Sequence, residues 1–316
     1  MKILITGASG FIGSFLVEEA LSRNAEVWAG VRRSSNKAYL QDSRISFINL
    51  NYLDMEQLKQ QISEHVARYG TWDYIIHNAG ITKSIDVRDF EKVNYLLTRR
   101  LIEALQETGA IPAKFILMSS LSASPNSESI YGQSKLKAER FLESQPDFPY
   151  IILRPTGVYG PRDKDYLLLL KTIDAGLDIT AGFQPQKLTF IYIKDLVKAV
   201  FLALENPVSR RAYCVTDGNV YTDSDYTQIV KTALGKKFTV KIRVPLFVLK
   251  AVCIFAESIA RRTKKPSTLN RDKYIIMKQR DWTCDNMPLR RELGFEADYD
   301  LEKGIAECVK WYRSIL

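Results

Sequence analysis

Short apolar segments alternate with longer amphipathic segments along the first half of the chain. The segments at 2–6, 74–77 and 114–118 are rich in apolar and branched side chains, which is typical of strands buried on both faces of a sheet. The segments between them carry apolar residues at helical spacing. This alternation predicts an α/β fold with a doubly wound parallel sheet that helices cover on both faces. Further strands are predicted at 26–31 and 45–50, and helices at 55–69, 90–107, 163–176 and from Tyr131 onward.

Three glycines, Gly7, Gly10 and Gly13, follow the first strand at intervals of three, and a helical pattern begins among them. Gly7 permits a turn that a side chain would obstruct, Gly10 leaves room for phosphates, and Gly13 lets the helix pack closely on its strand. The helix start, with Phe11 and Ile12, offers N–H groups and the positive end of its dipole to an anion. The segment predicts a dinucleotide-binding site. A tight turn without a ligand is the alternative interpretation.

Two arginines, Arg32 and Arg33, follow the second predicted strand. In NAD-preferring sites an acidic residue about 20 residues beyond the glycines binds the ribose hydroxyls. An arginine at that place attracts a 2′-phosphate instead, so the sequence favours NADP(H) as cofactor, with NAD(H) as the alternative. The alternative interpretation is that both arginines are simply exposed. Asn51 and Tyr52 follow the third strand, where the adenine would lie in a doubly wound sheet.

Tyr131 and Lys135 are four residues apart on a predicted helix and therefore share one face of it. A free tyrosine has a pKa of about 10, and we expect the neighbouring ammonium and a nicotinamide cation to lower it. The phenolate would take the proton of a secondary alcohol as hydride leaves the carbon. Ser120, at the end of the preceding strand, would hydrogen-bond the same oxygen. The alternative is an exposed tyrosine followed by an ordinary helix lysine.

Several motifs in this order resemble the extended short-chain dehydrogenase/reductase family, also called the NAD-dependent epimerase/dehydratase family. The motifs are the glycine turn at 6–13, the serine pair at 119–120, Tyr131-Gly-Gln-Ser-Lys135, and the segments at 153–161, 190–195, 282–285, 293–295 and 311–312. They extend over essentially the whole chain, so the likeness does not depend on a single match.

The resemblance implies a Rossmann domain over residues 1–160, to which the strand and helix near 188–217 return. It places a smaller α+β substrate-binding cap mainly in residues 161–316. It also implies that Ser120, Tyr131 and Lys135 are catalytic, and that Tyr131 and Lys135 contact the cofactor as well. Asn94 would support the lysine. Further cofactor contacts that the resemblance implies are Asn78, Ala79, Pro155 and Val158.

Some positions depart from the family pattern. Ser120 and Tyr131 are only 11 residues apart, where extended members usually have a longer connection. Gly157 stands where nucleotide-sugar enzymes often place an asparagine, and Asn51 replaces a frequent adenine-contacting aspartate. Together with Arg32, this pattern looks more like the dihydroflavonol reductase and 3β-hydroxysteroid dehydrogenase branches. Gly157 joins Ser120 as a candidate substrate contact.

Arg162 is a third candidate substrate contact, for an anionic substrate. A surface ion pair is the alternative for its guanidinium.

The leading hypothesis is an NADP(H)-preferring oxidoreductase that interconverts a secondary alcohol and a ketone of a small molecule. A nucleotide-sugar epimerase or dehydratase that retains NAD is the first alternative. A cofactor-sensing protein without catalysis is the second, and the intact Tyr131 and Lys135 argue against it. The substrate itself carries no signature in the sequence, and a homodimer is left open.

Composition limits the classes of partner. The 316 residues include 45 basic and 36 acidic side chains, a net charge of +9, but the basic residues are scattered in pairs and form no nucleic-acid signature. A net positive charge of this size suits phosphate-bearing ligands at least as well as it suits a nucleic acid. Four cysteines without paired spacing suggest reduced thiols in a cytoplasm and no metal site. The first strand starts at once, so no signal peptide is expected.

The most apolar stretch, 245–260, precedes a basic cluster that ends at Lys265. It is shorter than the ~20 residues that a membrane span needs. We expect a helix packed over the cap. The alternative is a surface helix over 245–265 that touches lipid peripherally and is anchored by the basic cluster.

Overall fold

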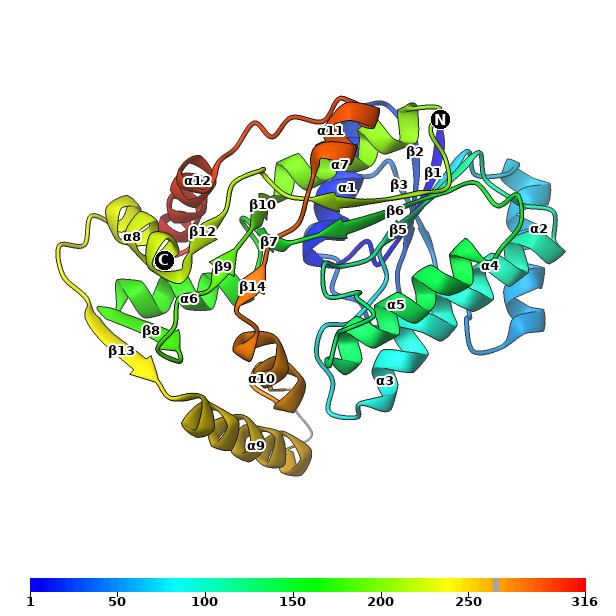
Figure 1. Ribbon diagram of the computed structural model, residues 1–316. Helices are drawn as coiled ribbons and strands as arrows, with labels where there is room; N and C mark the ends of the chain where they lie inside the picture. Colours follow the sequence, from blue (N-terminus) through cyan, green and yellow to red (C-terminus); the bar gives the residue numbers. More distant parts are fainter. Residues whose placement is uncertain (264–266) are drawn as a thin grey trace.

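The computed structural model describes residues 1–263 and 267–316. Its centre is a seven-stranded parallel sheet in the order β11-β6-β5-β4-β1-β2-β3 (Figure 1). The chain winds outward from β1 in one direction and from β4 in the other, so a topological switch point lies between these two strands. The predicted doubly wound Rossmann fold is confirmed. The strands are β1 (Lys2–Thr6), β2 (Glu26–Gly30), β3 (Ile45–Ile48), β4 (Tyr74–His77), β5 (Lys114–Met118), β6 (Tyr150–Pro155) and β11 (Arg211–Val215).

Alternate residues of the strands enter two separate cores. Ile3 and Ile5 of β1 pack into one core with α1 (Phe11–Ser22) and α7 (Ile193–Glu205), whereas Leu4 packs into the other. The second core is covered by α2 (Met55–Tyr69), α4 (Leu97–Glu107) and α5 (Ile130–Glu143). Burial on both faces explains why these strands read as continuous apolar runs.

The helix predicted over 90–107 is not uniform. A short α3 (Arg88–Phe90) leads into a π-helical segment, η1 (Glu91–Leu96), before α4 begins. The expectation of one regular helix was therefore wrong in this part. The wider π turn carries Asn94, which is buried. Such turns are frequent at functional sites.

The C-terminal cap combines helices with small sheets, as expected. β8 pairs with β13 in parallel, β7 with β10, and β9 lies between β12 and β14. Its strands are β7 (Gly157–Tyr159), β8 (Leu177–Ala181), β9 (Lys187–Leu188), β10 (Phe190–Tyr192), β12 (Tyr221–Thr222), β13 (Val240–Val244) and β14 (Asp281–Trp282). Its helices are α6 (Asp165–Asp174), α8 (Asp223–Leu234), α9 (Leu246–Thr263), α10 (Arg271–Lys278) and α12 (Leu301–Ser314). A further helix, α11 (Met287–Leu293), packs beside β11 of the central sheet.

The apolar stretch at 245–260 forms α9 on the outer rim of the cap, where it packs against α10 (Figure 1). Only Leu249, Cys253 and Ala260 of this helix are fully buried. Within the described residues, no helix is both long and apolar enough to cross a membrane. Lys264 and Lys265, at the end of the predicted lipid-contacting stretch, lie outside the described residues.

A buried ion pair fixes α5 against the sheet. The Glu139 side chain is 0% exposed and accepts hydrogen bonds from Arg154 on β6, with Nε to Oε1 at 3.0 Å and Nη2 to Oε2 at 2.5 Å. Ser119, directly after β5, also donates to Glu139. Because Glu139 lies one turn beyond Lys135, this network sets the position of α5 relative to the carboxyl ends of β5 and β6.

Arg154→Ala is expected to lower the free energy of unfolding by about 3 kcal/mol, because it leaves the Glu139 carboxylate buried without its partner. Urea unfolding measures the loss. The matched control is Arg211→Ala, whose side chain is 61% exposed and lies 3.5 Å from Glu292. That exposed pair is expected to contribute less than about 1 kcal/mol. Similar losses in the two variants would contradict the role given to burial.

Candidate active site at the carboxyl edge of the sheet

The turn between β1 and α1 is packed too tightly for side chains. Gly7 has a φ of +65°, and a Cβ there would lie 2.9 Å from the backbone of Asn78 and Ala79 beyond β4. A Cβ on Gly13 would lie 2.2 Å from the Gly7 carbonyl oxygen. The Gly10 N–H donates to that same oxygen at 3.1 Å. The glycines thus bring the turn, the helix start and the end of β4 together at the switch point.

This turn fits the diphosphate of a dinucleotide. The first N–H groups of α1, including those of Phe11 and Ile12, have no partner within the helix. The first turn of α1 contains no acidic residue, so nothing there competes with an anion for the positive end of the dipole. The side chains of Phe11 and Ile12 pack against the core. Their side chains therefore hold the helix on the sheet, and cofactor contacts by their backbone N–H groups stay a prediction.

Arg32 and Arg33 are exposed just beyond β2. Within the described residues, neither guanidinium takes part in a hydrogen bond or ion pair; the backbone of Arg32 is engaged, with its N–H donating to Ser35 Oγ at 3.1 Å and its carbonyl accepting from Ser35 N at 3.0 Å. Both charges remain available to an anion.

Asn51 and Tyr52 lie in the loop after β3. The Asn51 amide is used within this loop: its Oδ1 accepts from Leu53 N at 3.1 Å and its Nδ2 donates to Gln57. Tyr52 packs against the second core, and burial raises the pKa of its hydroxyl. Adenine contacts by these two residues stay a prediction.

Tyr131 lies in the first turn of α5, and the Ser120 side chain lies near enough to its hydroxyl to act on the tyrosine pKa by hydrogen bonding. The loop after β5 folds directly onto this turn, because a Cβ on Gly132 would lie 2.3 Å from the Ser122 carbonyl oxygen. The Ser122 N–H donates to Ser120 Oγ at 3.1 Å. The short connection between the serine and the tyrosine is therefore what brings their hydroxyls together.

Lys135 is buried one turn further along α5, and its Nζ donates to the Met118 carbonyl oxygen at 2.9 Å. Asn94 lies nearby: its Nδ2 donates to Ser134 Oγ at 3.0 Å, and its Oδ1 accepts from Ile81 N at 2.8 Å. A Cβ on Gly80 would lie 2.9 Å from Lys135 Nζ and 3.1 Å from Asn94 Oδ1. Lysine and asparagine therefore converge on the same stretch of backbone beyond β4.

Burial changes both titratable groups. It lowers the pKa of Lys135 to about 8, with Glu139 acting in the opposite direction. It also raises the pKa of Tyr131, which the Ser120 hydrogen bond lowers and the charge of Asp272 raises further. The expectation that a neighbouring ammonium lowers the tyrosine pKa was therefore wrong for the protein by itself, because desolvation of the phenolate dominates.

Asp272 is a residue near the candidate site that the sequence motifs did not indicate. It lies on α10 of the cap, and its buried carboxylate accepts from Ser129 Oγ at 2.9 Å and from Ile130 N at 2.6 Å. Ser129 itself caps α5 by accepting from Gly132 N at 3.1 Å. The cap thus holds the start of the helix that carries Tyr131. Because Ser129 and Asp272 are 143 positions apart in the sequence, no local pattern indicates this contact.

The candidate contacts after β6 are closely packed. A Cβ on Gly157 would lie 2.3 Å from the Tyr166 hydroxyl oxygen, so the end of that ring occupies the space beside the glycine. The Pro155 carbonyl accepts from Leu121 N at 3.0 Å, and Val158 packs against the core. Cofactor contacts by Pro155 and Val158 stay a prediction.

Arg162 is engaged with α1. Its guanidinium forms an ion pair with Glu18 at 2.7 Å and donates to Ser14 Oγ at 3.1 Å. It also lies 4.4 Å from the ring centroids of Phe15 and Tyr39. The structure thus shows the ion pair that was the alternative to substrate contact.

His77 ends β4 as a packed residue. Its Nδ1 lies 2.9 Å from Thr6 Oγ1 and its Nε2 lies 3.0 Å from Thr98 Oγ1. Burial, and secondarily the charge of Lys135, lowers its pKa to about 3. In the part of the chain that the structure describes, no group of three or more His, Cys, Asp or Glu side chains is arranged to hold a metal.

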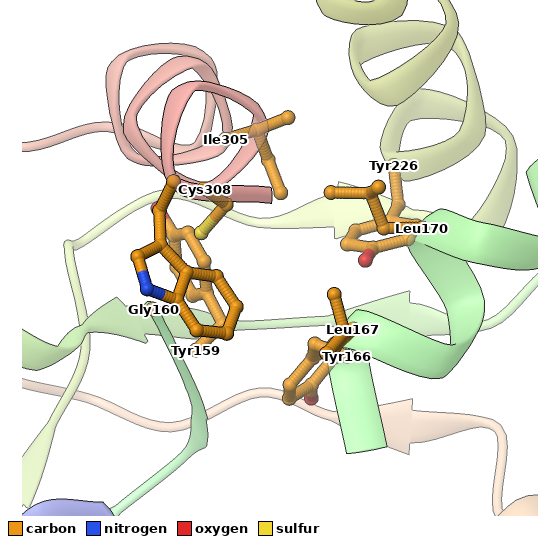
Figure 2. Close-up of a pocket in the computed structure, with 9 residues that line it drawn as sticks. Tyr159, Gly160, Tyr166, Leu167, Leu170, Tyr226, Ile305 and Cys308 are labelled. Carbon is orange, nitrogen blue, oxygen red and sulfur yellow. The ribbon is translucent and has the colours of Figure 1, made fainter. Parts of the chain in front are cut away.

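A small cavity lies inside the cap and contains none of the predicted site residues (Figure 2). Its volume of about 10 Å³ admits a single water molecule and no substrate. Residues of β7, α6, α8 and α12 line it, among them Tyr159, Tyr166, Leu170, Tyr226, Ile305 and Cys308.

Comparisons with known proteins agree with this geometry. The model of the NAD dependent epimerase/dehydratase family matches residues 3–216. A ceramide reductase of Caulobacter vibrioides is 26% identical over 99% of this chain and 94% of its own length. A 3-beta-hydroxysteroid dehydrogenase of Mycolicibacterium neoaurum is 24% identical over 99% of this chain and 92% of its own length. The UDP-glucose 4-epimerase structure from Thermotoga maritima superposes with a TM-score of 0.79 at 23% identity, covering 100% of this chain and 99% of that one, which shows the shared fold.

Two substitutions are expected to move the pKa of Tyr131 in opposite directions. Asp272→Asn removes a negative charge that opposes the phenolate, so the pKa falls; Ser120→Ala removes a hydrogen bond that favours the phenolate, so it rises. The ¹³C shift of the tyrosine Cζ carbon, followed against pH, measures both changes. The resonance among the 16 tyrosines is assigned with Tyr131→Phe. Shifts of the same sign would contradict this electrostatic description.

Proposed function

The chain belongs to the NAD dependent epimerase/dehydratase family, and we propose that within this family it is an oxidoreductase that interconverts a secondary alcohol and a ketone. The observation that carries the proposal is the position of the Tyr131 hydroxyl, close to Ser120 and one helical turn from the buried Lys135. A phenol, a hydroxyl and an ammonium in this order suit proton transfer to and from one substrate oxygen.

The residues around the switch point would hold the cofactor. Gly7, Gly10 and the start of α1 would bind the diphosphate, and Lys135, supported by Asn94, would bind the nicotinamide ribose. The bound nicotinamide would supply the hydride acceptor or donor. We propose NADP(H) over NAD(H), because the guanidinium of Arg32 is exposed at the end of β2 and no carboxylate stands in its place.

Tyr131 would donate its proton to the carbonyl oxygen of a ketone, and in the opposite direction it would accept the proton of the alcohol. Ser120 would hydrogen-bond the same oxygen and fix its position. The charge of Lys135, one turn away, would favour the phenolate that remains after the proton has left.

The proposed substrate is a lipophilic molecule. Two full-length relatives are named for a ceramide and for a 3β-hydroxysteroid. In addition, the ring of Tyr166 fills the space at Gly157, where nucleotide-sugar enzymes often place an asparagine. Both observations favour an alcohol or ketone on an apolar body over a nucleotide sugar.

Tyr131→Phe is expected to lower kcat by about 10³-fold with unchanged cofactor binding, because the phenyl ring fills the same space but carries no proton. Nicotinamide absorbance, with a panel of steroid and long-chain ketones, measures turnover. The control is Tyr69→Phe, at an exposed tyrosine at the end of α2. Full activity of Tyr131→Phe would refute the proposal. Copurified NAD(H) that resists dialysis, without net turnover of free cofactor, would favour an epimerase or dehydratase.

Arg32→Ala is expected to weaken NADP(H) binding by roughly tenfold to a hundredfold and to leave NAD(H) binding nearly unchanged, because only the former carries the 2′-phosphate. Fluorescence titration of the reduced cofactors measures both constants. Arg291→Ala, at an exposed arginine on α11, serves as the control for loss of one positive charge. Equal effects on both cofactors would refute the NADP(H) preference.

A further inference from the structure

An apolar stripe faces solvent along α9. Phe247 is 76% exposed and Phe255 is 68% exposed, and Val252 and Ile259 are exposed as well. By helical periodicity, Phe247 and Phe255 lie opposite the buried Leu249, Cys253 and Ala260, and Val252 and Ile259 lie on the flank between the two sides. Scattered exposed apolar residues are ordinary, but a row of them on one helix marks an interaction site.

The strand before α9 extends the apolar surface. β13 runs directly into α9 at the rim of the cap (Figure 1). Ile242 of β13 pairs in register with Ile179 of β8, and both are exposed, at 40% and 48%. Phe238, just before β13, is 76% exposed. We call the exposed apolar residues of α9 and β13, with Phe238 and Ile179, the cap face.

The cap face lies in a strongly basic segment. Residues 236–263 contain seven lysines and arginines and one carboxylate, so they carry +6 of the net +9 of the chain. The carboxylate, Glu257, is paired with Arg261 at 2.7 Å. Lys241, Arg243 and Lys250 are exposed in the same segment, with Lys241 and Arg243 on the face of β13 opposite to Ile242. A partner that fits this face therefore has an apolar layer beside a negatively charged layer.

We propose that the cap face docks on the surface of an anionic lipid bilayer. The phenylalanines of α9 enter the boundary between headgroups and acyl chains, and the surrounding lysines and arginines contact the lipid phosphates. A second copy of the chain fits this face poorly, because a twofold interface would bring two segments of +6 together. Nucleic acid matches the charge but leaves the phenylalanines without a partner.

Docking at this face would act close to the catalytic helix. α9 packs on α10, and Asp272 of α10 accepts hydrogen bonds from Ser129 and Ile130 at the start of α5. The helix that touches the bilayer is thus separated from Tyr131 by one packed element. Docking itself does not depend on the proposed reaction and is measured without substrate or nucleotide.

Cosedimentation of the full chain with vesicles tests the proposal. The protein is expected to bind vesicles of equimolar phosphatidylcholine and phosphatidylglycerol and to bind pure phosphatidylcholine much more weakly. Lys241→Gln with Arg243→Gln is expected to weaken binding by roughly thirtyfold, about fivefold for each lost charge. Phe247→Ser with Phe255→Ser is expected to weaken it by more than about tenfold.

Two matched controls carry equivalent changes elsewhere. Leu53→Ser alters an apolar side chain that is 84% exposed after β3, and Arg290→Gln with Arg291→Gln removes two charges from α11. Both are expected to bind as the unaltered chain does, and circular dichroism checks the fold of every variant. Absence of binding to the anionic vesicles, equal binding to neutral ones, or unchanged binding of the cap-face variants would overturn the proposal. So would a dimer, detected by light scattering, that Phe247→Ser with Phe255→Ser dissociates.

Discussion

The fixation of α5 at two points is the constraint on which the candidate site depends. Near its middle, the fully buried Glu139 is held by Arg154 of β6. At its start, Ser129 and Ile130 donate to Asp272 of the cap. A carboxylate that is buried in this way has lost its water and keeps its charge only while its partners stay in place. Each anchor is therefore sensitive to small displacements, and together they hold the row of side chains between them.

Burial shifts the pKa values of Tyr131 and Lys135 in opposite directions, and each shift favours the uncharged form of the group. The pKa of Tyr131 is raised and that of Lys135 is lowered to about 8, so an uncharged phenol is the resting form at neutral pH. A phenol donates a proton more readily than it accepts one. In the proposed reaction, this uncharged phenol would be the form that donates a proton to a ketone, and oxidation of an alcohol would require a further positive charge near the phenolate.

The sequence was sufficient for features that follow from local periodicity or from glycine sterics. Strands buried on both faces were found at 2–6, 74–77 and 114–118, and the turn at Gly7 has the positive φ that its position requires. The π-helical segment 91–96 could not be predicted, because six residues are too few to distinguish its period from that of an α-helix. The sequence did not predict the direction of the Tyr131 pKa shift. Desolvation of the hydroxyl depends on the groups that tertiary packing places around it.

Contacts between distant segments were equally out of reach. Cys214 and Cys284 looked unrelated in the sequence, yet the fold makes their side chains neighbours. From the sequence, Arg162 could pair either with an anionic substrate or with a surface carboxylate. The fold places Glu18 and two aromatic rings around its guanidinium. Such pairings depend on how the cap folds back on the sheet. A short stretch of neighbouring residues does not determine that arrangement.

The short connection between Ser120 and Tyr131 links these observations. Because a side chain at Gly132 would collide with Ser122 and Ser127 at 2.3 Å, this loop lies flat on the first turn of α5. A loop that is used in this way cannot also extend over the substrate. α10 reaches the start of α5 from the other side and contributes Asp272 there. The cap helix α10 thus contacts the start of the helix that carries the tyrosine, and α9, which packs on α10, has an outer surface that is apolar and basic.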